Sequence, residues 1–396
     1  MTEARFTPLR ERHESLGASF TDFGGWQMPV RYTSDLAEHH AVRQAAGLFD
    51  ISHMAEFLVH GSEAAAFLDY ALAGHLSTMI IGKAKYSLLL SDSGGIIDDV
   101  IVYRISDDRF LIISNAGNRD AVSAALSERV RAHAFRRTPE MVDDNGSFAF
   151  VGGKTGVTVE DVSDSFALIA IQGPASETIA AAIDGITDLT VPWAEQKYYA
   201  WTDARYNGEP LIVARTGYTG EDGFELLVRA EDAAALWDAA LAVGEPHGLV
   251  PAGLAARDTL RLEAGMPLYG HELSLGIKPA QAGLGRVVAS DKDDFVGKNA
   301  VDASTGSAIA GPARVLVGLA ADGKRAGRAG YAVVADDGTV IGEITSGALS
   351  PTLGHPIAMA FVDPAFTDEG ATVFLDVRGT KIPATVTALP FYRRKK

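Results

Sequence analysis

The segment from Arg215 to Glu225 combines a glycine-rich turn with a carboxylate at the start of an apolar run. Its three glycines recur at every third position, a density expected where the backbone turns tightly or a ligand approaches closely. Two further acids, Glu221 and Asp222, and the lack of a lysine argue against a phosphate site. Glu225 on a rigid strand suits a ligand with paired N–H donors, such as a guanidinium or a 2-aminopyrimidinone. For this segment alone, a β-hairpin with a solvated acidic tip is the favoured alternative.

Two adjacent carboxylates, Asp98 and Asp99, lie within a run of β-branched residues. Strand neighbours point to opposite faces of a sheet. The predicted faces are Asp99 with Ile97, Ile101 and Tyr103, and Asp98 with Ile96, Val100 and Val102. The alternative is an exposed strand end after Gly94 and Gly95. Either buried face nevertheless carries a carboxylate, which is costly unless it has a partner. Because Tyr103 forms an aromatic wall on the Asp99 face, we predict Asp99 as the site residue.

A third group of charged residues lies in the predicted helix from Gly253 to Gly265. Asp258 and Arg261 are three residues apart, so we expect them to pair across one turn on a salt-bridged helix surface. Arg257, near the start of the helix, can instead present its guanidinium to a ligand oxygen or carboxylate.

Several other patterns do not predict a site. The segment from Gly152 to Thr155 lacks the first glycine of a phosphate-binding loop. The run from Glu38 to His40 lacks metal-ligand spacing and is predicted to be a polar helix face. His53 is either an acid–base group or, as is more common for a lone histidine, a structural residue. We therefore expect neither a metal nor a nucleotide.

Mixed elements must position these residues. Helical spacing is found at 61–73, 118–133 and 231–243. Strand-like runs are found at 56–60, 96–103, 110–114, 166–171, 211–214 and 224–229. The pattern predicts an α+β fold. From about Val315 onward, short strands at 315–319, 331–334, 371–377 and 382–386 predict a separate β-barrel or sandwich.

Length and composition set the remaining limits. The chain has 396 residues, so we expect domains at 1–140, 141–290 and 291–396, with a linker zone at 291–307. A net charge of −16 argues against nucleic-acid or anionic-membrane partners. The absence of cysteine, of a signal peptide and of any 18-residue apolar run predicts a cytoplasmic protein without a membrane span.

Six segments together resemble the glycine cleavage system T-protein family, the folate-dependent aminomethyltransferases, in the family's order from Thr7 to Arg393. They are Phe23 to Tyr32, Phe49 to Met54, Gly94 to Tyr103, Arg215 to Glu225, Gly253 to Gly270 and Thr345 to Gly354. The resemblance implies three domains in a ring-like arrangement around a central folate cavity, with a C-terminal β-barrel domain. It implies tetrahydrofolate as acceptor and the lipoylated H-protein as carrier of the aminomethyl donor. Ammonia is released and 5,10-methylenetetrahydrofolate forms.

The resemblance also implies roles for individual residues. Asp99 matches the catalytic aspartate, Glu225 the carboxylate that holds the pterin, and Arg257 an arginine of the folate site. The cavity lining is expected to include Met54, Tyr86, Asn115, Tyr198 and Tyr218, with Tyr103 on the Asp99 face. The tail from Pro390 to Arg393 is expected near the emerging glutamate end of the folate.

Two alternatives within the resemblance differ in chemistry. A folate-dependent demethylase of a small sulfonium or N-methyl donor would share the folate geometry, and overall motif fidelity favours the T-protein over it. A non-catalytic folate-binding relative in iron–sulfur assembly would carry a cysteine motif, which this chain lacks. The chain departs from the family at about 136–157, where we expect a surface insertion.

Overall fold

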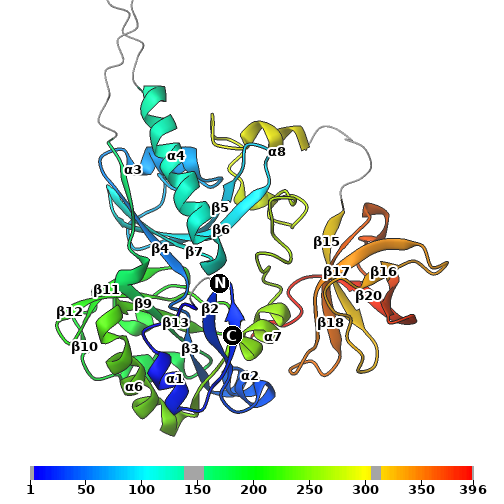
Figure 1. Ribbon diagram of the computed structural model, residues 1–396, viewed down its shortest axis with the longest axis horizontal. Coiled ribbons are helices and arrows are strands. Elements are labelled where there is room, and N and C mark those ends of the chain that lie inside the picture. Colours follow the sequence, from blue (N-terminus) through cyan, green and yellow to red (C-terminus); the bar gives the residue numbers. More distant parts are fainter. Residues whose placement is uncertain (1–3, 138–155, 305–313, 395–396) are drawn as a thin grey trace, which may run out of the picture.

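The computed structural model describes residues 4–137, 156–304 and 314–394 of the chain. Within these ranges the chain forms two large sheets with covering helices, a two-stranded ribbon and a closed barrel (Figure 1). The ribbon consists of β1 (Ser19–Phe23) and β2 (Trp26–Arg31). Helices and strands are mixed rather than strictly alternating. The α+β class expected from the sequence is confirmed.

A five-stranded antiparallel sheet carries the paired aspartates. Its order is β5 (Ala84–Leu90), β6 (Ile96–Ser106), β7 (Arg109–Ser114), β4 (Ala55–His60) and β8 (Thr158–Asp161). Helices α3 (Ala64–Ala71) and α4 (Arg119–Arg137) pack against one face, where they meet Val100 and Val102 of β6. Ile101 and Tyr103 therefore point from the opposite face, into a core shared with the second sheet.

The alternation along β6 is interrupted near its start. The register of β5 and β6 shifts between Leu89 and Leu90. Ile97 packs with the cluster that contains Val100, whereas Ile96 packs in a different core. The expected faces of these two isoleucines were wrong, because the irregular register breaks the two-residue period. From Asp98 onward the expected alternation is confirmed.

A seven-stranded sheet carries Glu225. Its order is β10 (Ile186–Thr187), β11 (Trp201–Tyr206), β12 (Glu209–Ala214), β13 (Gly223–Arg229), β9 (Phe166–Gln172), β3 (Ala46–Asp50) and β14 (Leu249–Pro251). Only β3 and β14 pair in parallel. The outer face packs against α5 (Ser176–Ala181) and α6 (Ala233–Gly244), while α1 (Arg10–Ser15) lies nearby. The inner face includes Leu168, Ala170 and Leu227, which join the core shared with the first sheet. Glu225 lies two residues before Leu227 and so faces the same interior.

The C-terminal strands close into a six-stranded barrel. They run in the order β15 (Val315–Ala321), β18 (Pro356–Val362), β17 (Val340–Leu349), β16 (Ala332–Val334), β19 (Thr372–Val377) and β20 (Thr380–Thr387). The four strands expected here are confirmed and the barrel is closed. Two strands, β17 and β18, were not expected, because glycine and small residues weaken the strand signal of β17 and proline begins β18.

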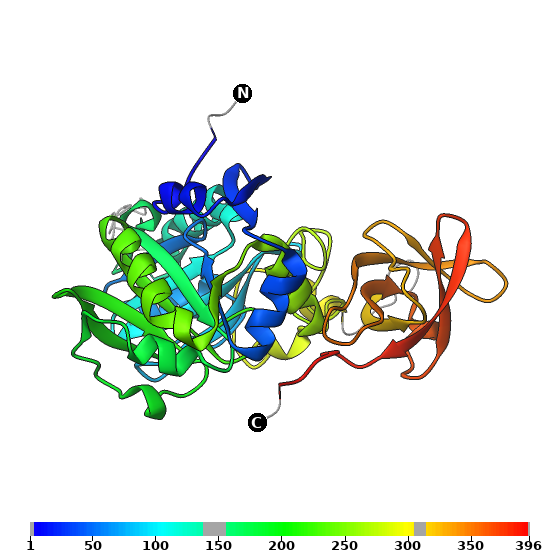
Figure 2. The same ribbon diagram turned by 90° about the horizontal axis from the view of Figure 1, so that it is seen from below.

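The barrel lies to one side of the two sheets and contacts them through α7 (Leu254–Glu263) (Figures 1 and 2). Leu262 of α7 packs with Ile357 and Met359 of β18. The C-terminal tail returns from the barrel to the same helix, where the Tyr392 N–H donates to the Glu263 carbonyl at 2.8 Å. The barrel and tail thus support a helix whose other residues face the sheets.

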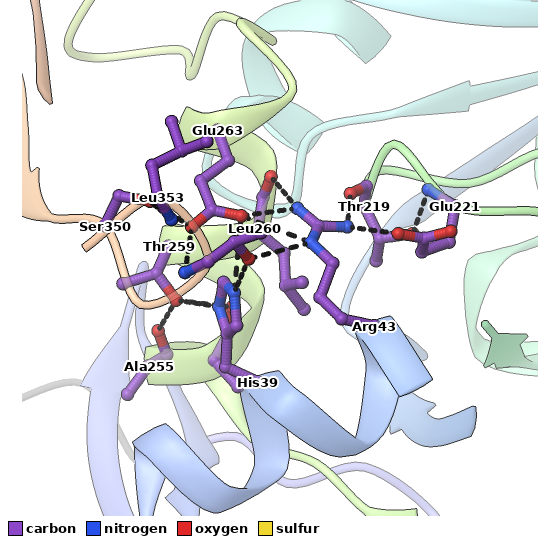
Figure 3. Close-up of polar contacts among 12 residues, drawn as sticks. His39, Arg43, Thr219, Glu221, Ala255, Thr259, Leu260, Glu263, Ser350 and Leu353 are labelled. Atoms are coloured by element: carbon purple, nitrogen blue, oxygen red, sulfur yellow. Dashed lines mark hydrogen bonds and ion pairs between the residues drawn. The ribbon is translucent and has the colours of Figure 1, made fainter. Parts of the chain in front are cut away.

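A buried charge cluster lies where the barrel, α7 and α2 (Asp35–Gln44) meet (Figure 3). The Glu263 carboxylate accepts from Arg43 Nη2 at 2.8 Å and from the Thr352 N–H at 3.0 Å. His39, which is fully buried, lies 3.3 Å from the same carboxylate. The expectation that Glu38 to His40 form a polar helix face was wrong for Glu38 and His39, because long-range packing buries both.

The domain boundaries stay a prediction, and the sheets do not divide the chain at residue 140. Strand β3 belongs to the second sheet through its pairing with β9. The linker zone contains α8 (Lys298–Ser304), and its last residues, 305–307, lie outside the described ranges. Most of the expected insertion at 136–157 also lies outside them. No helix in the described ranges has the length and apolar character needed to cross a membrane.

Candidate functional site

A cavity of about 650 Å³ lies between the two sheets. Its walls come from β6 and β13, from the turn after β3, from α7 with the loop that follows, and from the tip of the β1–β2 ribbon. Most of the lining is apolar, and Asp99, Glu225 and Arg257 provide charge. A concave, mostly apolar space with a few polar groups is the usual form of a small-molecule site.

Asp99 is held in the cavity wall by two neutral donors. Tyr86 Oη donates to Asp99 Oδ2 at 3.1 Å, and Asn115 Nδ2 donates to Asp99 Oδ1 at 2.8 Å. The same amide donates to Asp98 Oδ1 at 2.8 Å, and Asn118 Nδ2 adds a bond of 2.6 Å. Both carboxylates therefore have partners, as their burial requires. Asp98 is fully buried behind the wall, whereas Asp99 reaches the cavity.

Burial raises the pKa of both aspartates. Burial, together with the charge of Asp99, raises the pKa of Asp98 to about 7, although Asn118 and Asn115 donate to it. Burial also raises the pKa of Asp99, and the bonds from Tyr86 and Asn115 oppose that rise. Because the two carboxylates repel each other when both are charged, ionisation of one disfavours ionisation of the other. The cavity thus contains a carboxylate whose ionised form is stabilised by hydrogen bonds rather than by a cation.

Glu225 is buried in the opposite wall. Thr216 Oγ1 donates to one of its carboxylate oxygens, and the Tyr103 hydroxyl lies 3.4 Å from Thr216 Oγ1. Burial raises the pKa of Glu225, and the Thr216 bond and the charge of Arg257 oppose that rise. Its second oxygen can accept from a ligand.

The acidic tip expected before Glu225 is not solvated. Glu221 is buried and lies 3.0 Å from Arg43 Nη1. Asp222 lies 2.5 Å from Arg215 and 3.2 Å from Arg394. The solvated-tip alternative was wrong, because arginines from elsewhere in the chain cover this turn.

Arg257 enters the cavity from the first turn of α7. The helix ends at Glu263, and Gly265 just beyond it has a φ of +64°, which permits the Met266 N–H to bond the Arg261 carbonyl at 3.0 Å. The guanidinium carbon of Arg257 lies 5.0 Å from the Tyr218 ring centroid. Its Nη1 is buried and has no hydrogen-bond partner in the described part of the chain. A buried cation without such a partner suits an acceptor on a ligand.

Arg261 occupies an interior position. It pairs with Asp258 as expected, at 2.7 Å, but it is only 2% exposed. It also lies 3.1 Å from Glu272 and donates to Ser346 Oγ of β17 at 2.8 Å. The expectation of a surface salt bridge was wrong for Arg261, because the barrel and the loop after α7 cover it.

The structure brings most of the predicted site residues to one cavity. Its lining includes Asp99, Glu225 and Arg257 together with Met54, Tyr86, Tyr103, Asn115 and Tyr218. Tyr218 also donates to the Pro267 carbonyl at 2.5 Å, which fixes its ring beside Arg257.

Tyr198 lies outside this lining. Its side chain is 43% exposed, and Arg394 lies over its ring at 5.6 Å. Tyr199 lines the cavity instead. Its left-handed backbone, with φ of +56°, and its bonds to Arg215 and Ala84 turn the neighbouring tyrosine outward. Sequence reasoning placed the wrong member of this pair in the cavity.

Other lining residues were not assigned to the cavity from sequence. They include Phe23 at the ribbon tip, His53 in the turn after β3, and the segment from Met266 to Leu268 with His271. The matched segments included Phe23, His53 and Met266 to Leu268, so position within a matched motif was the available signal for these residues; His271 follows the last residue of its matched segment. In the described ranges, no group of three or more His, Asp or Glu side chains is arranged to hold a metal ion.

Comparison with known proteins identifies related sequences over the full chain. The GCVT N-terminal domain model matches residues 9–292, and the model of the glycine cleavage T-protein C-terminal barrel domain matches 314–393. Curated aminomethyltransferases of Cutibacterium acnes and Streptomyces avermitilis are 52% and 51% identical. The first alignment covers 100% of both chains, and the second covers 99% of this chain and 98% of the relative. The crystal structure of glycine cleavage system aminomethyltransferase T from Bartonella henselae matches with a TM-score of 0.85 and 35% identity, covering 100% of both chains.

Proposed function

Because this chain belongs to the glycine cleavage T-protein family and is an aminomethyltransferase, we propose that its central cavity binds tetrahydrofolate and that Asp99 is the catalytic carboxylate. The donor is the aminomethyl group on the lipoyl arm of the H-protein, and the products are ammonia and 5,10-methylenetetrahydrofolate. The single observation that carries this proposal is the presence of Asp99, Glu225 and Arg257 in the lining of one cavity.

The polar groups of the cavity fit a reduced pterin. Glu225 is buried, and its only hydrogen bond from a side chain in the described residues is that of Thr216, so it can accept from paired N–H groups of a 2-aminopyrimidinone edge. Arg257 supplies donors for an oxygen of the ligand. Tyr103, Tyr199 and Tyr218 provide aromatic walls. Together these residues fix both the ring plane and its orientation.

Asp99 performs the chemical role in this proposal. When bound, the folate supplies the nitrogen that accepts the one-carbon group. Asp99 stabilises positive charge that develops beside it, and it can hold or take the proton of the attacking nitrogen. Tyr86 and Asn115 hold its two oxygens, so little reorganisation is needed during the reaction. The surrounding apolar wall strengthens this interaction by excluding water.

The relatives favour the aminomethyltransferase over the demethylase alternative, since those that match the full length carry the former name. The H-protein as partner and the cytoplasmic location are part of this proposal. We expect purified protein to release ammonia when supplied with aminomethylated H-protein and tetrahydrofolate together. Absence of ammonia release under these conditions would contradict the proposed reaction.

Glu225→Gln tests the binding role separately. The change replaces an acceptor-only carboxylate by an amide of nearly the same shape, so one N–H of the ligand loses its acceptor. We expect the dissociation constant for tetrahydrofolate to rise about 10- to 100-fold, as for a lost hydrogen bond to a charged group. The matched control is Glu209→Gln on the neighbouring strand, where the side chain is 46% exposed. Equal affinities of the two variants by calorimetry would remove the role of Glu225.

A further inference from the structure

His53 is a buried polar residue of the cavity wall that the proposed mechanism does not use. It lies in the turn after β3, is 4% exposed and lines the cavity. Its Nδ1 atom is buried and has no hydrogen-bond partner in the described ranges. Buried polar atoms in native proteins are usually paired, so an unpaired one beside a ligand cavity points to a partner on the ligand.

The surroundings of His53 determine what it can bind. The ring of Phe23, at the tip of the β1–β2 ribbon, packs edge-on against it with centroids 5.4 Å apart. The nearest carboxylate in sequence, Asp50, is already engaged, because Thr7 Oγ1 donates to it at 2.5 Å and His13 Nε2 lies 2.8 Å away. His53 therefore has an apolar cover on one side and no carboxylate free to pair with it there.

His53 is uncharged near neutral pH. Burial lowers its pKa to about 4, the charge of Arg257 acts in the same direction, and Asp50 opposes them. A neutral imidazole offers one donor and one acceptor. Such a ring does not attract an anion, and it suits an uncharged polar group such as a carbonyl, an amide or a ring N–H.

We propose that His53 is a further folate-binding residue, whose neutral ring makes a hydrogen bond to an uncharged polar group of the bound tetrahydrofolate. This inference rests on the proposed function. In the proposed complex, Glu225 and Arg257 contact the pterin through charged groups, and His53 adds an uncharged hydrogen-bonding group from the turn after β3. Phe23 covers the ring and keeps water from competing for that bond.

The test compares two substitutions in the full-length protein. His53→Phe keeps an aromatic ring against Phe23 and removes both nitrogens, whereas His53→Gln keeps one donor and one acceptor. We expect His53→Phe to weaken tetrahydrofolate binding about tenfold, as for one neutral hydrogen bond. His53→Gln is expected to stay within about threefold of wild type. His247 is exposed, so His247→Phe and His247→Gln are the matched controls. Wild-type affinity in His53→Phe would overturn the proposal.

A spectroscopic readout separates a hydrogen bond from a packing effect. The His53 ring signals are assigned in a ¹⁵N-histidine spectrum by their loss in His53→Gln. We expect addition of tetrahydrofolate to move the His53 ring nitrogen shifts while the ring stays neutral between pH 6 and 8, a range that begins about two pH units above its pKa of about 4. Unmoved shifts at saturating tetrahydrofolate would overturn the proposal.

The same measurements distinguish failure of this inference from failure of the proposed function. If wild type binds tetrahydrofolate and Glu225→Gln binds weakly, but His53→Phe binds as wild type does, only the role of His53 is lost. If wild type does not bind tetrahydrofolate, the proposed function fails and this inference fails with it.

Discussion

Replacing Glu263 by glutamine should destabilise the protein strongly at neutral pH and less in acid. Burial disfavours the charged form of Glu263, but His39, Ser350 and Arg43 outweigh it and lower the pKa from 4.5 to about 2. At about 1.4 kcal/mol per pH unit, the ionised carboxylate contributes about 3 kcal/mol of stability at pH 7. Because the folded pKa is depressed, this contribution is present above pH 4.5 and is lost as the pH falls toward 2.

Urea unfolding at pH 7 and at pH 3 tests this reasoning. At pH 3 the contribution of Glu263 falls to about 1.4 kcal/mol, so the difference between Glu263→Gln and wild type should shrink by about half. The control is Glu14→Gln, which removes an exposed pair with Arg10 whose side chains are 48% and 50% exposed. That pair should contribute less than about 1 kcal/mol at either pH. A Glu263→Gln effect no larger than the control, or one independent of pH, would refute the account.

Two further predictions concern the cavity. Tyr86→Phe removes a donor to Asp99 and so raises the pKa of that carboxyl, which should move the acid limb of the kcat–pH profile about one pH unit higher. The control is Tyr198→Phe, which lies outside the cavity lining and should leave the profile unchanged. Identical profiles for the two variants would contradict the prediction. Arg257→Met removes a buried guanidinium whose Nη1 is unpaired, so calorimetry should show about 10- to 100-fold weaker tetrahydrofolate binding with an unchanged or higher melting temperature. Retained affinity together with a lower melting temperature would instead make Arg257 a structural residue.

Local patterns predicted the strands that carry the site. The β-branched run of β6 and the two-residue period placed Asp99 on the same face as Tyr103, and both line the cavity. The strand expected at 224–229, which carries Glu225, is observed as β13. These predictions were confirmed because strand propensity and alternation depend on neighbours in sequence.

Long-range packing accounts for what the sequence did not predict. Arg261 and His39 have the spacing of exposed helical residues, but the barrel docks on α7 and buries both. The bonds from Arg261 to Ser346 and from His39 to Thr352 span 85 and 313 residues of the chain, so they leave no local pattern. The presence of Tyr199 rather than Tyr198 in the cavity likewise depends on one left-handed residue, which is held by Ala84 of β5 and by Arg215 just after β12. Glycine is the residue that usually marks such a conformation, and none stands at this position.

The central claim is that Asp99 provides the charge for one-carbon transfer, and single-turnover ammonia release by Asp99→Asn tests it most directly. The amide keeps the size of the side chain and can still bond Tyr86, so tetrahydrofolate affinity should stay near that of wild type. With aminomethylated H-protein and saturating tetrahydrofolate, we expect the rate to fall about 100- to 10,000-fold. A rate within about threefold of wild type, with the same folate affinity, would contradict the account.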